Sequence, residues 1–269
     1  MGSASGDRGQ ANLVGFILVF GFLLISYSLF QAYVIPNQNA EIEYQHYQEV
    51  RDDMTELYSE IVTLGNSSSG RQVLVPVTLG MDYPPRLLFF NPPPASGSIG
   101  STGQGTIAID ATDGTTAADL CGGNATTGLV YSPGYHVTTQ PDVRYDNGLL
   151  YVETAGGEYA MLERRQIVDE SSKEIQLYRL VGQLGTRSGV DTLPIEITGG
   201  AGPVVTTDVP VTSVTVRSDL PKDEWNDPDN DVLPSNINAS DAGDGRVQLQ
   251  GFSGDYTVSC HSVGLGQRP

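Results

Sequence analysis

The longest hydrophobic pattern lies near the N-terminus, where residues 13–35 contain no charged side chain. A helix of that length extends about 34 Å at 1.5 Å per residue, and the hydrocarbon core of a bilayer is about 30 Å thick. The segment is apolar on every face, unlike a helix packed in a soluble domain. It also exceeds the apolar run of a cleaved secretory signal, and it ends in aromatic and polar residues, whereas such a signal ends in a small-x-small cleavage site. The pattern therefore predicts a membrane-spanning helix.

A second helical pattern follows Pro36, a residue that we expect to kink or interrupt the helix. Six apolar residues recur there at spacings of three and four, which places them on one stripe of a helix that ends near Gly65. They are Tyr47, Val50, Met54, Leu57, Ile61 and Leu64. The stripe either packs on the protein's own β domain or forms a coiled seam with other subunits, and the sequence leaves both open.

From residue 65 onward, short β-branched or aromatic runs alternate with Gly, Pro, Asn and Asp. The runs are Val73–Leu79, Leu87–Phe90, Thr106–Ile109, Leu149–Glu153, Ile175–Val181, Leu193–Thr198, Val211–Val216, Val247–Gln250 and Tyr256–Ser259. Asp146-Asn147-Gly148 predicts a tight hairpin, and Asn91–Gly105 and Asp219–Asp244 predict long polar loops. The fold class expected is α+β: one long N-terminal helix over residues 10–64, then a mainly antiparallel, sandwich-like β domain over residues 65–269.

The net charge of the chain indicates which classes of binding partner to expect. The 269 residues include 14 Lys and Arg against 32 Asp and Glu, a formal net charge of -18. Such an excess repels phosphate backbones, and no basic cluster reverses the sign locally, so a nucleic-acid partner is not expected. Only Lys173 and Lys222 are lysines, and Asp, Thr and Gly are abundant. We interpret this composition as that of a halophilic protein, in which high salt screens the repulsion between carboxylates.

Charges beside the span predict its orientation. Arg8 and the amino terminus precede it, whereas Glu41, Glu43 and Glu49 follow it. By the positive-inside rule the N-terminus is cytoplasmic, and the β domain lies outside the cell.

Cysteines and sequons agree with an exported domain. Cys121 and Cys260 are the only cysteines and form no CxxC pair, which favours one disulfide; two buried free thiols are the alternative. Asn66, Asn124 and Asn238 each begin an N-x-[ST] sequon and are candidate glycosylation sites.

Catalytic motifs are missing from the sequence. It contains no G-x-S-x-G, H-E-x-x-H or P-loop pattern and only three histidines, so we do not expect an enzyme or a cofactor. One candidate metal-ligand group, Asp227, Asp229 and Asp231, offers carboxylates that calcium binds. Val232 and Asn238 replace the Gly and Glu of an EF-hand loop. We favour an ordinary acidic loop here, and a calcium loop of another type is the alternative.

The residues before the span resemble a known family. In Asp7-Arg8-Gly9-Gln10-Ala11-Asn12-Leu13, a short polar leader ends in a basic residue and Gly, and an unbroken apolar helix follows. This arrangement is similar to the class III signal peptide of archaeal type IV pilin-like proteins, over residues 7 to about 64. The resemblance implies that a prepilin-type peptidase cuts between Gly9 and Gln10 and so removes residues 1–9.

The chain departs from that family in two ways. Val14 stands at the fifth mature position, where bacterial pilins have Glu, a residue that archaeal relatives commonly lack. The exported part is also larger than in many major pilins, which favours a minor pilin or a pilin-like surface protein.

These features lead to two hypotheses for function. The first is a pilin-like structural subunit of a surface filament, with a role in adhesion, whose N-terminal helix contacts membrane and then other subunits. The second is a membrane-anchored ectodomain that acts as a binding module or, less in keeping with the sequence, as an ectoenzyme. Aromatic residues that could stack on glycans in the second case are Tyr131, Tyr135, Tyr145 and Trp225.

The composition generates one prediction about salt. We expect the part of the chain outside the membrane, residues 65–269, to show a rising thermal transition temperature as salt increases from about 0.1 M to above 1 M, because screening relieves repulsion among its carboxylates. Thermal unfolding followed by circular dichroism measures it. A flat or falling transition temperature would contradict the halophilic interpretation.

Overall fold

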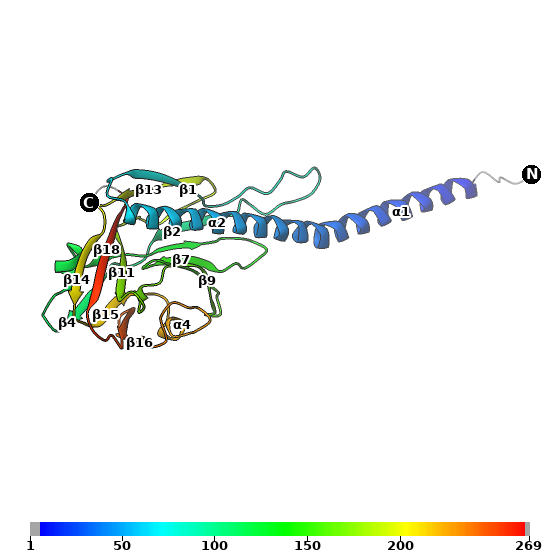
Figure 1. Ribbon diagram of the computed structural model, residues 1–269. Helices are drawn as coiled ribbons and strands as arrows, with labels where there is room; N and C mark the ends of the chain where they lie inside the picture. Colours follow the sequence, from blue (N-terminus) through cyan, green and yellow to red (C-terminus); the bar gives the residue numbers. More distant parts are fainter. Residues whose placement is uncertain (1–5, 267–269) are drawn as a thin grey trace, which may run out of the picture.

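A computed structural model of the protein describes residues 6–266, with side chains described from residue 13 onward. Its N-terminal part is one long helical rod that projects from a β domain (Figure 1). The rod consists of α1 (Gly6–Leu29), a π-helical turn η1 (Phe30–Val34) and α2 (Ile35–Asn66). The α+β class predicted from the sequence is confirmed: an apolar N-terminal helix precedes a mostly antiparallel β domain.

The π turn explains how the rod passes Pro36 without ending. Proline cannot donate to the carbonyl four residues earlier, and its ring crowds that carbonyl. In η1 the backbone hydrogen bonds reach five residues back, as from the Ile35 N–H to the Phe30 oxygen, which widens the turn just before the proline. The rod changes direction in this region (Figure 1). The expected kink is therefore present, and the helix continues beyond it.

Within the part of the chain that the structure describes, three sheets and one short strand pair form the β domain. The first sheet has the order β1 (Gln72–Thr78), β13 (Thr192–Gly199), β18 (Tyr256–Leu265), β11 (Glu174–Gly182) and β10 (Val168–Asp169), with β14 (Val204–Val209) also on β18. The second has the order β12 (Arg187–Gly189), β2 (Gly97–Ser101), β6 (Leu129–Ser132), β7 (Asp142–Asp146), β8 (Leu149–Glu153) and β9 (Tyr159–Arg164).

The third sheet has the order β16 (Asn238–Asp241), β17 (Arg246–Gln250), β15 (Val211–Arg217) and β4 (Ala108–Ala111). The strand pair is β3 (Gly105–Thr106) with β5 (Ala125–Thr126), and two short helices, α3 (Ala117–Cys121) and α4 (Lys222–Trp225), lie in connections. Strands β11 and β18 are parallel, and the other ladders between named strands are antiparallel.

Helix α2 completes the core between the first two sheets. All six residues of the predicted stripe are buried in one cluster with side chains such as Val75 of β1, Ile99 of β2 and Tyr145 of β7. The stripe therefore packs on the protein's own β domain, the first of the two arrangements that the sequence left open. Each fully buried Leu or Ile of this kind contributes about 1.5–3 kcal/mol relative to exposure.

A second core lies on the other side of the first sheet. Side chains of β15 and β17 meet the opposite face of β11 and β18 there, around the buried Trp225. A disulfide joins Cys121 at the end of α3 to Cys260 in β18, with a Cα–Cα distance of 5.2 Å. It links two segments that are 139 positions apart in this core.

The hairpin predicted at Asp146-Asn147-Gly148 is confirmed. Strands β7 and β8 pair from Asp146 with Leu149 to Asp142 with Glu153. The turn residues Asn147 and Gly148 have φ of 48° and 84°, the positive values that a tight hairpin turn requires.

Other expectations about the β domain were wrong. Leu87–Phe90 is not a strand, because Pro84, Pro85 and Pro92–Pro94 on its two sides supply no backbone donors to a ladder. The stretch expected to be a polar loop over Asn91–Gly105 contains β2, whose small residues carry almost no hydrophobic signal. The loop expected over Asp219–Asp244 contains α4 and β16.

The shared core changes the design of the salt measurement. The core crosses the boundary expected at residue 65, because it includes helix residues from Tyr47 to Leu64. A fragment that starts at residue 65 would expose the sheets beneath the helix. The measurement therefore needs a chain that starts just after the span, near Asn37.

Candidate functional site: an exposed apolar helix and its junction with the β domain

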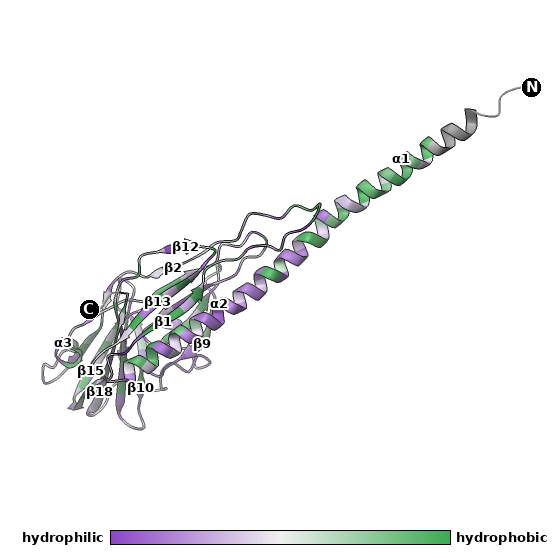
Figure 2. Ribbon diagram, turned by 90° about the horizontal axis from the view of Figure 1, so that it is seen from above, coloured by the Kyte–Doolittle hydropathy of each residue, from purple (hydrophilic) through white to green (hydrophobic). Residues whose placement is uncertain are grey.

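The largest exposed apolar surface belongs to α1. Most of its side chains from Leu13 to Leu29 are exposed on all sides of the helix, and Phe16, Leu18 and Phe22 are 67%, 67% and 69% exposed. Figure 2 shows this part of the rod as mostly hydrophobic, beyond the end of the β domain. The helix is long and apolar enough to cross a membrane. An apolar surface of this size marks a membrane or protein interaction site.

Where the helical rod meets the β domain, a buried carboxylate on the helix accepts hydrogen bonds from the domain. Glu43 of α2 is 0% exposed. One of its oxygens accepts hydrogen bonds from the His136 and Val137 amides at 3.0 Å each, and from the Tyr83 hydroxyl. The other accepts from the Thr138 amide at 2.6 Å and the Thr138 hydroxyl at 2.8 Å. One helix side chain thus holds two loops of the β domain.

The hydrogen bonds keep Glu43 ionised. Burial raises the pKa of its carboxyl, but the donors from Tyr83, Thr138 and His136 outweigh that effect, so the pKa lies below its ordinary value. Charge-assisted hydrogen bonds of this kind are about twice as strong as neutral ones.

Two further polar contacts lie on the same face of α2. Asn39 accepts from Arg86 at 2.7 Å, and His46 Nδ1 lies 2.6 Å from the Tyr135 hydroxyl. Burial lowers the pKa of His46, which keeps its ring neutral. Asn39 and Glu43 continue the stripe that starts at Tyr47, at intervals of four residues. Polar residues at stripe positions, where apolar residues are expected, indicate buried hydrogen bonds. Asn39 and Glu43 carried this signal in the sequence, and the junction was not predicted from it.

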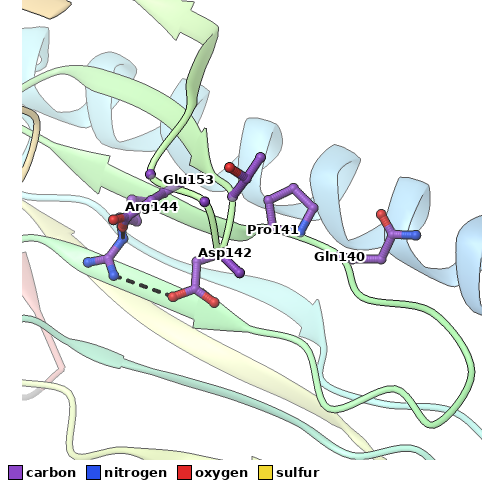
Figure 3. A pocket seen from close by; sticks show the side chains of 9 residues that line it. Gln140, Pro141, Asp142, Arg144 and Glu153 are labelled. Atoms are coloured by element: carbon purple, nitrogen blue, oxygen red, sulfur yellow. Dashed lines mark hydrogen bonds and ion pairs between the residues drawn. The ribbon is translucent and has the colours of Figure 1, made fainter.

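A surface pocket of about 540 Å³ lies beside the second sheet, next to the turn that joins β8 and β9 (Figure 3). Arg144 on β7 is its one basic residue, and Asp142, Glu153 and Asp219 already neutralise it at 3.3, 2.5 and 3.7 Å. A guanidinium paired in this way offers little to an anionic ligand. The pocket is therefore a weak candidate for a binding site.

Asp146, at the end of β7, is the buried acid nearest to this group. It is 2% exposed and accepts a hydrogen bond from the Asp219 amide at 2.8 Å. Burial raises its pKa to about 7, with a further contribution from the charge of Asp219, and the charge of Arg217 opposes the shift. The carboxyl therefore gains its proton near neutral pH.

The structure separates the residues that the sequence analysis singled out. Asn66, Asn124 and Asn238 are all exposed and lie far apart in the chain, and the Asn66 amide donates to the Val62 carbonyl at 2.8 Å. The leader residues Arg8, Gly9 and Gln10 belong to α1 by backbone, and their side chains lie outside the described residues.

The three aspartates considered as candidate calcium ligands do not come together. Asp227 accepts from the Asp229 amide at 2.9 Å, which is ordinary turn geometry, and Asp231 pairs with Arg164 at 3.0 Å. Within residues 6–266, no three His, Cys, Asp or Glu side chains are grouped so that they could hold a metal ion.

The glycan-stacking role considered for four aromatic residues does not fit the structure. Tyr131, Tyr145 and Trp225 are 0%, 2% and 1% exposed, so their rings are part of the cores. Tyr135 is half-buried and bonded to His46. Large rings in a β domain are placed by packing, and their number in the sequence did not reveal which were accessible.

His261 is likewise a packing residue. It stacks on Tyr178 with 4.4 Å between ring centroids, and its Nδ1 lies 3.2 Å from the Gly65 oxygen at the end of α2. Its neighbour Cys260 is held in the disulfide.

Comparison with known proteins identified no relative of this chain. No protein-family model matches the chain, and no curated protein and no solved structure matches it at a significant level.

The junction yields a prediction for Glu43→Gln. The amide group places N–H donors where the native carboxylate accepts, so we expect the free energy of unfolding at neutral pH to fall by about 2–3 kcal/mol. The amides of His136, Val137 and Thr138 should exchange hydrogen faster. Hydrogen-exchange mass spectrometry on the full chain in detergent measures this. Glu41→Gln, on the exposed side of the same helix turn, is the control and should leave the exchange unchanged.

Asp146 yields a prediction about pH. Its folded pKa of about 7 lies above the value near 4 of an unfolded chain, so the folded state binds the extra proton and stability rises as pH falls through 7. We expect a higher unfolding midpoint at about pH 6.5 than at about pH 8.5. Asp146→Asn should reduce this difference, and the exposed Asp255→Asn should retain it. An unchanged pH profile in Asp146→Asn would contradict the prediction.

Proposed function

We propose that this protein is a pilin-like surface subunit, anchored in the cell membrane by α1 with its β domain outside the cell, and able to enter a surface filament through the same helix. One observation carries the proposal. A single continuous helix presents an apolar half that is exposed over most of its surface and a second half that is part of the β domain's core.

This arrangement suits a subunit that exchanges lipid for protein neighbours. The apolar surface of α1 can be covered by lipid chains or by the helices of other subunits. Because α2 is held by its buried stripe and by Glu43, a pull on α1 is transmitted to a folded β domain. Transfer from membrane to filament then requires no unfolding. The π turn at the start of α2 supplies a bend between the two halves.

The processing step in this proposal acts on the leader, residues 1–9. A prepilin-type peptidase would remove the leader after Gly9 and leave the apolar helix intact. Arg8 would hold the leader at the cytoplasmic surface, and Gly9 would give the protease uncrowded backbone. An anchored ectodomain that never assembles would have the same topology and no such cut, so cleavage distinguishes the two hypotheses.

The proposal predicts the effect of Gly9→Val. A β-branched side chain crowds the backbone at the scissile bond, so the precursor should keep its first nine residues, remain in the membrane and be missing from sheared surface filaments. The mature N-terminus of wild-type protein should be Gln10. Mass spectrometry of membrane and sheared fractions measures both. Gly6→Val is the matched control and should be processed normally. Wild-type protein that keeps residues 1–9 would contradict the pilin assignment.

A further inference from the structure

The connection between β1 and β2 reaches back along the rod and touches the apolar helix. Figure 1 shows this loop extending beside the helix, beyond the rest of the β domain. At its tip the sequence Leu87-Leu88-Phe89-Phe90 packs on the end of α1 and on η1. The Phe89 ring lies 5.2 Å from Tyr27 and 4.8 Å from Phe30, centroid to centroid.

The other side chains of the tip point away from the helix. Leu87, Leu88 and Phe90 are 86%, 76% and 78% exposed, values as high as those of α1 itself. Leu88 also has a φ of 70°, a conformation that turns usually assign to Gly or Asn. A turn selected for solubility or ease of bending would not carry Leu at that position. The tip therefore exposes apolar side chains even though Leu88 must adopt an unfavourable backbone conformation to do so.

The tip lies at the level of the membrane. Tyr27 is 14 residues beyond Leu13, about 21 Å along the helix, and a hydrocarbon core of about 30 Å that starts at Leu13 ends near Ala32. The tip contacts α1 and η1 between Tyr27 and Gln31. It therefore stands beside the outermost turns of the span, where aromatic side chains favour the interface.

Polar groups of the span satisfy the backbone of the tip. The Tyr27 hydroxyl donates to the Leu88 carbonyl at 2.5 Å. Gln31 donates to the Phe90 carbonyl at 3.0 Å and accepts from the Phe90 amide at 3.2 Å. Non-helical backbone enters an apolar layer only when its polar groups have such partners. These contacts also account for a glutamine within an otherwise apolar segment.

Charge in this connection is compatible with a lipid surface. The chain has 32 acidic residues, yet none lies between Asp82 and Asp110. Arg86 follows Pro84 and Pro85 at the base of the tip, where it donates to Asn39 at 2.7 Å, and Asn91 donates to the Pro84 carbonyl at 2.7 Å. These hydrogen bonds close the loop at its base. Between Pro84 and Asn91 the loop also contains no carboxylate, whose charge would oppose entry into a bilayer.

We propose that the tip, residues 87–90, inserts into the outer leaflet of the bilayer beside α1 and is a second membrane contact of the protein. The inference rests on the membrane anchoring proposed above and does not require filament assembly. With two contacts, the helix and the tip, the β domain is held at a defined tilt and rotation over the membrane. A single helix with a bend at η1 would leave both free.

The test introduces a fluorescent reporter at the tip. The full chain with Phe90→Trp is reconstituted at high dilution in vesicles of phosphatidylcholine and phosphatidylglycerol, with and without bromine atoms on the acyl chains. The native Trp225 is 1% exposed and supplies the baseline, measured with the wild-type chain. Val205→Trp, exposed on β14 at the far end of the β domain, is the matched control (Figure 1).

Brominated lipid should quench most of the emission added by Phe90→Trp and little of that added by Val205→Trp. Adding Leu88→Glu to the Phe90→Trp chain should abolish the quenching and leave the protein in the vesicles, because an ionised carboxylate is expelled from the leaflet.

Three other outcomes would count against the proposal. Anchored protein in which the emission added by Phe90→Trp is quenched no more than that of the control would overturn this inference alone. Emission added by Phe90→Trp that stays unquenched at high dilution, and shifts to shorter wavelength only at high protein density, would assign the tip to a contact with a second copy of the chain and also overturn the inference. Protein that does not float with the vesicles would overturn the anchoring itself.

Discussion

The burial of one helix face beneath two sheets is the constraint on which the rest of this structure depends. Residues from Tyr47 to Leu64 fill the space between the first and second sheets, and without them both sheets would expose their inner sides. The helix is therefore part of the β domain, although it is continuous with a segment whose apolar side chains are mostly exposed. The place where the apolar half leaves the domain follows from this attachment, and the turn η1 sets its direction.

Glu43 and Asn39 extend the attachment where apolar packing stops. Nearer α1 the helix no longer has a sheet beneath it, and two long loops take its place. Loops expose backbone N–H groups, and an ionised carboxylate is a strong acceptor for several of them at once. The change from apolar to polar contacts along one face of α2 thus matches the change from sheet to loop below it.

The same reasoning links the span to the tip of residues 87–90. Hydrogen bonds from Tyr27 and Gln31 lie one step further along the rod, in the layer where water is excluded once a membrane is present. Three successive environments, an apolar core, a polar junction and the proposed lipid interface, are met by three sets of side chains on one continuous helix. In the function proposed above, a subunit built in this way changes the neighbours of its apolar half and keeps the geometry of the other half.

The sequence by itself determined the elements that depend on local periodicity and composition. The uncharged run of residues 13–35, the stripe from Tyr47 to Leu64 and the Asp146-Asn147-Gly148 turn were readable because helix period, span length and turn chemistry are properties of neighbouring residues. Tertiary structure alone decided what covers the stripe, which aromatic rings are buried, and that Asp227, Asp229 and Asp231 stay apart. It also decided the partners of Glu43 and the position of residues 87–90, because these depend on contacts between segments about 40 to 95 positions apart, and no local pattern encodes such contacts.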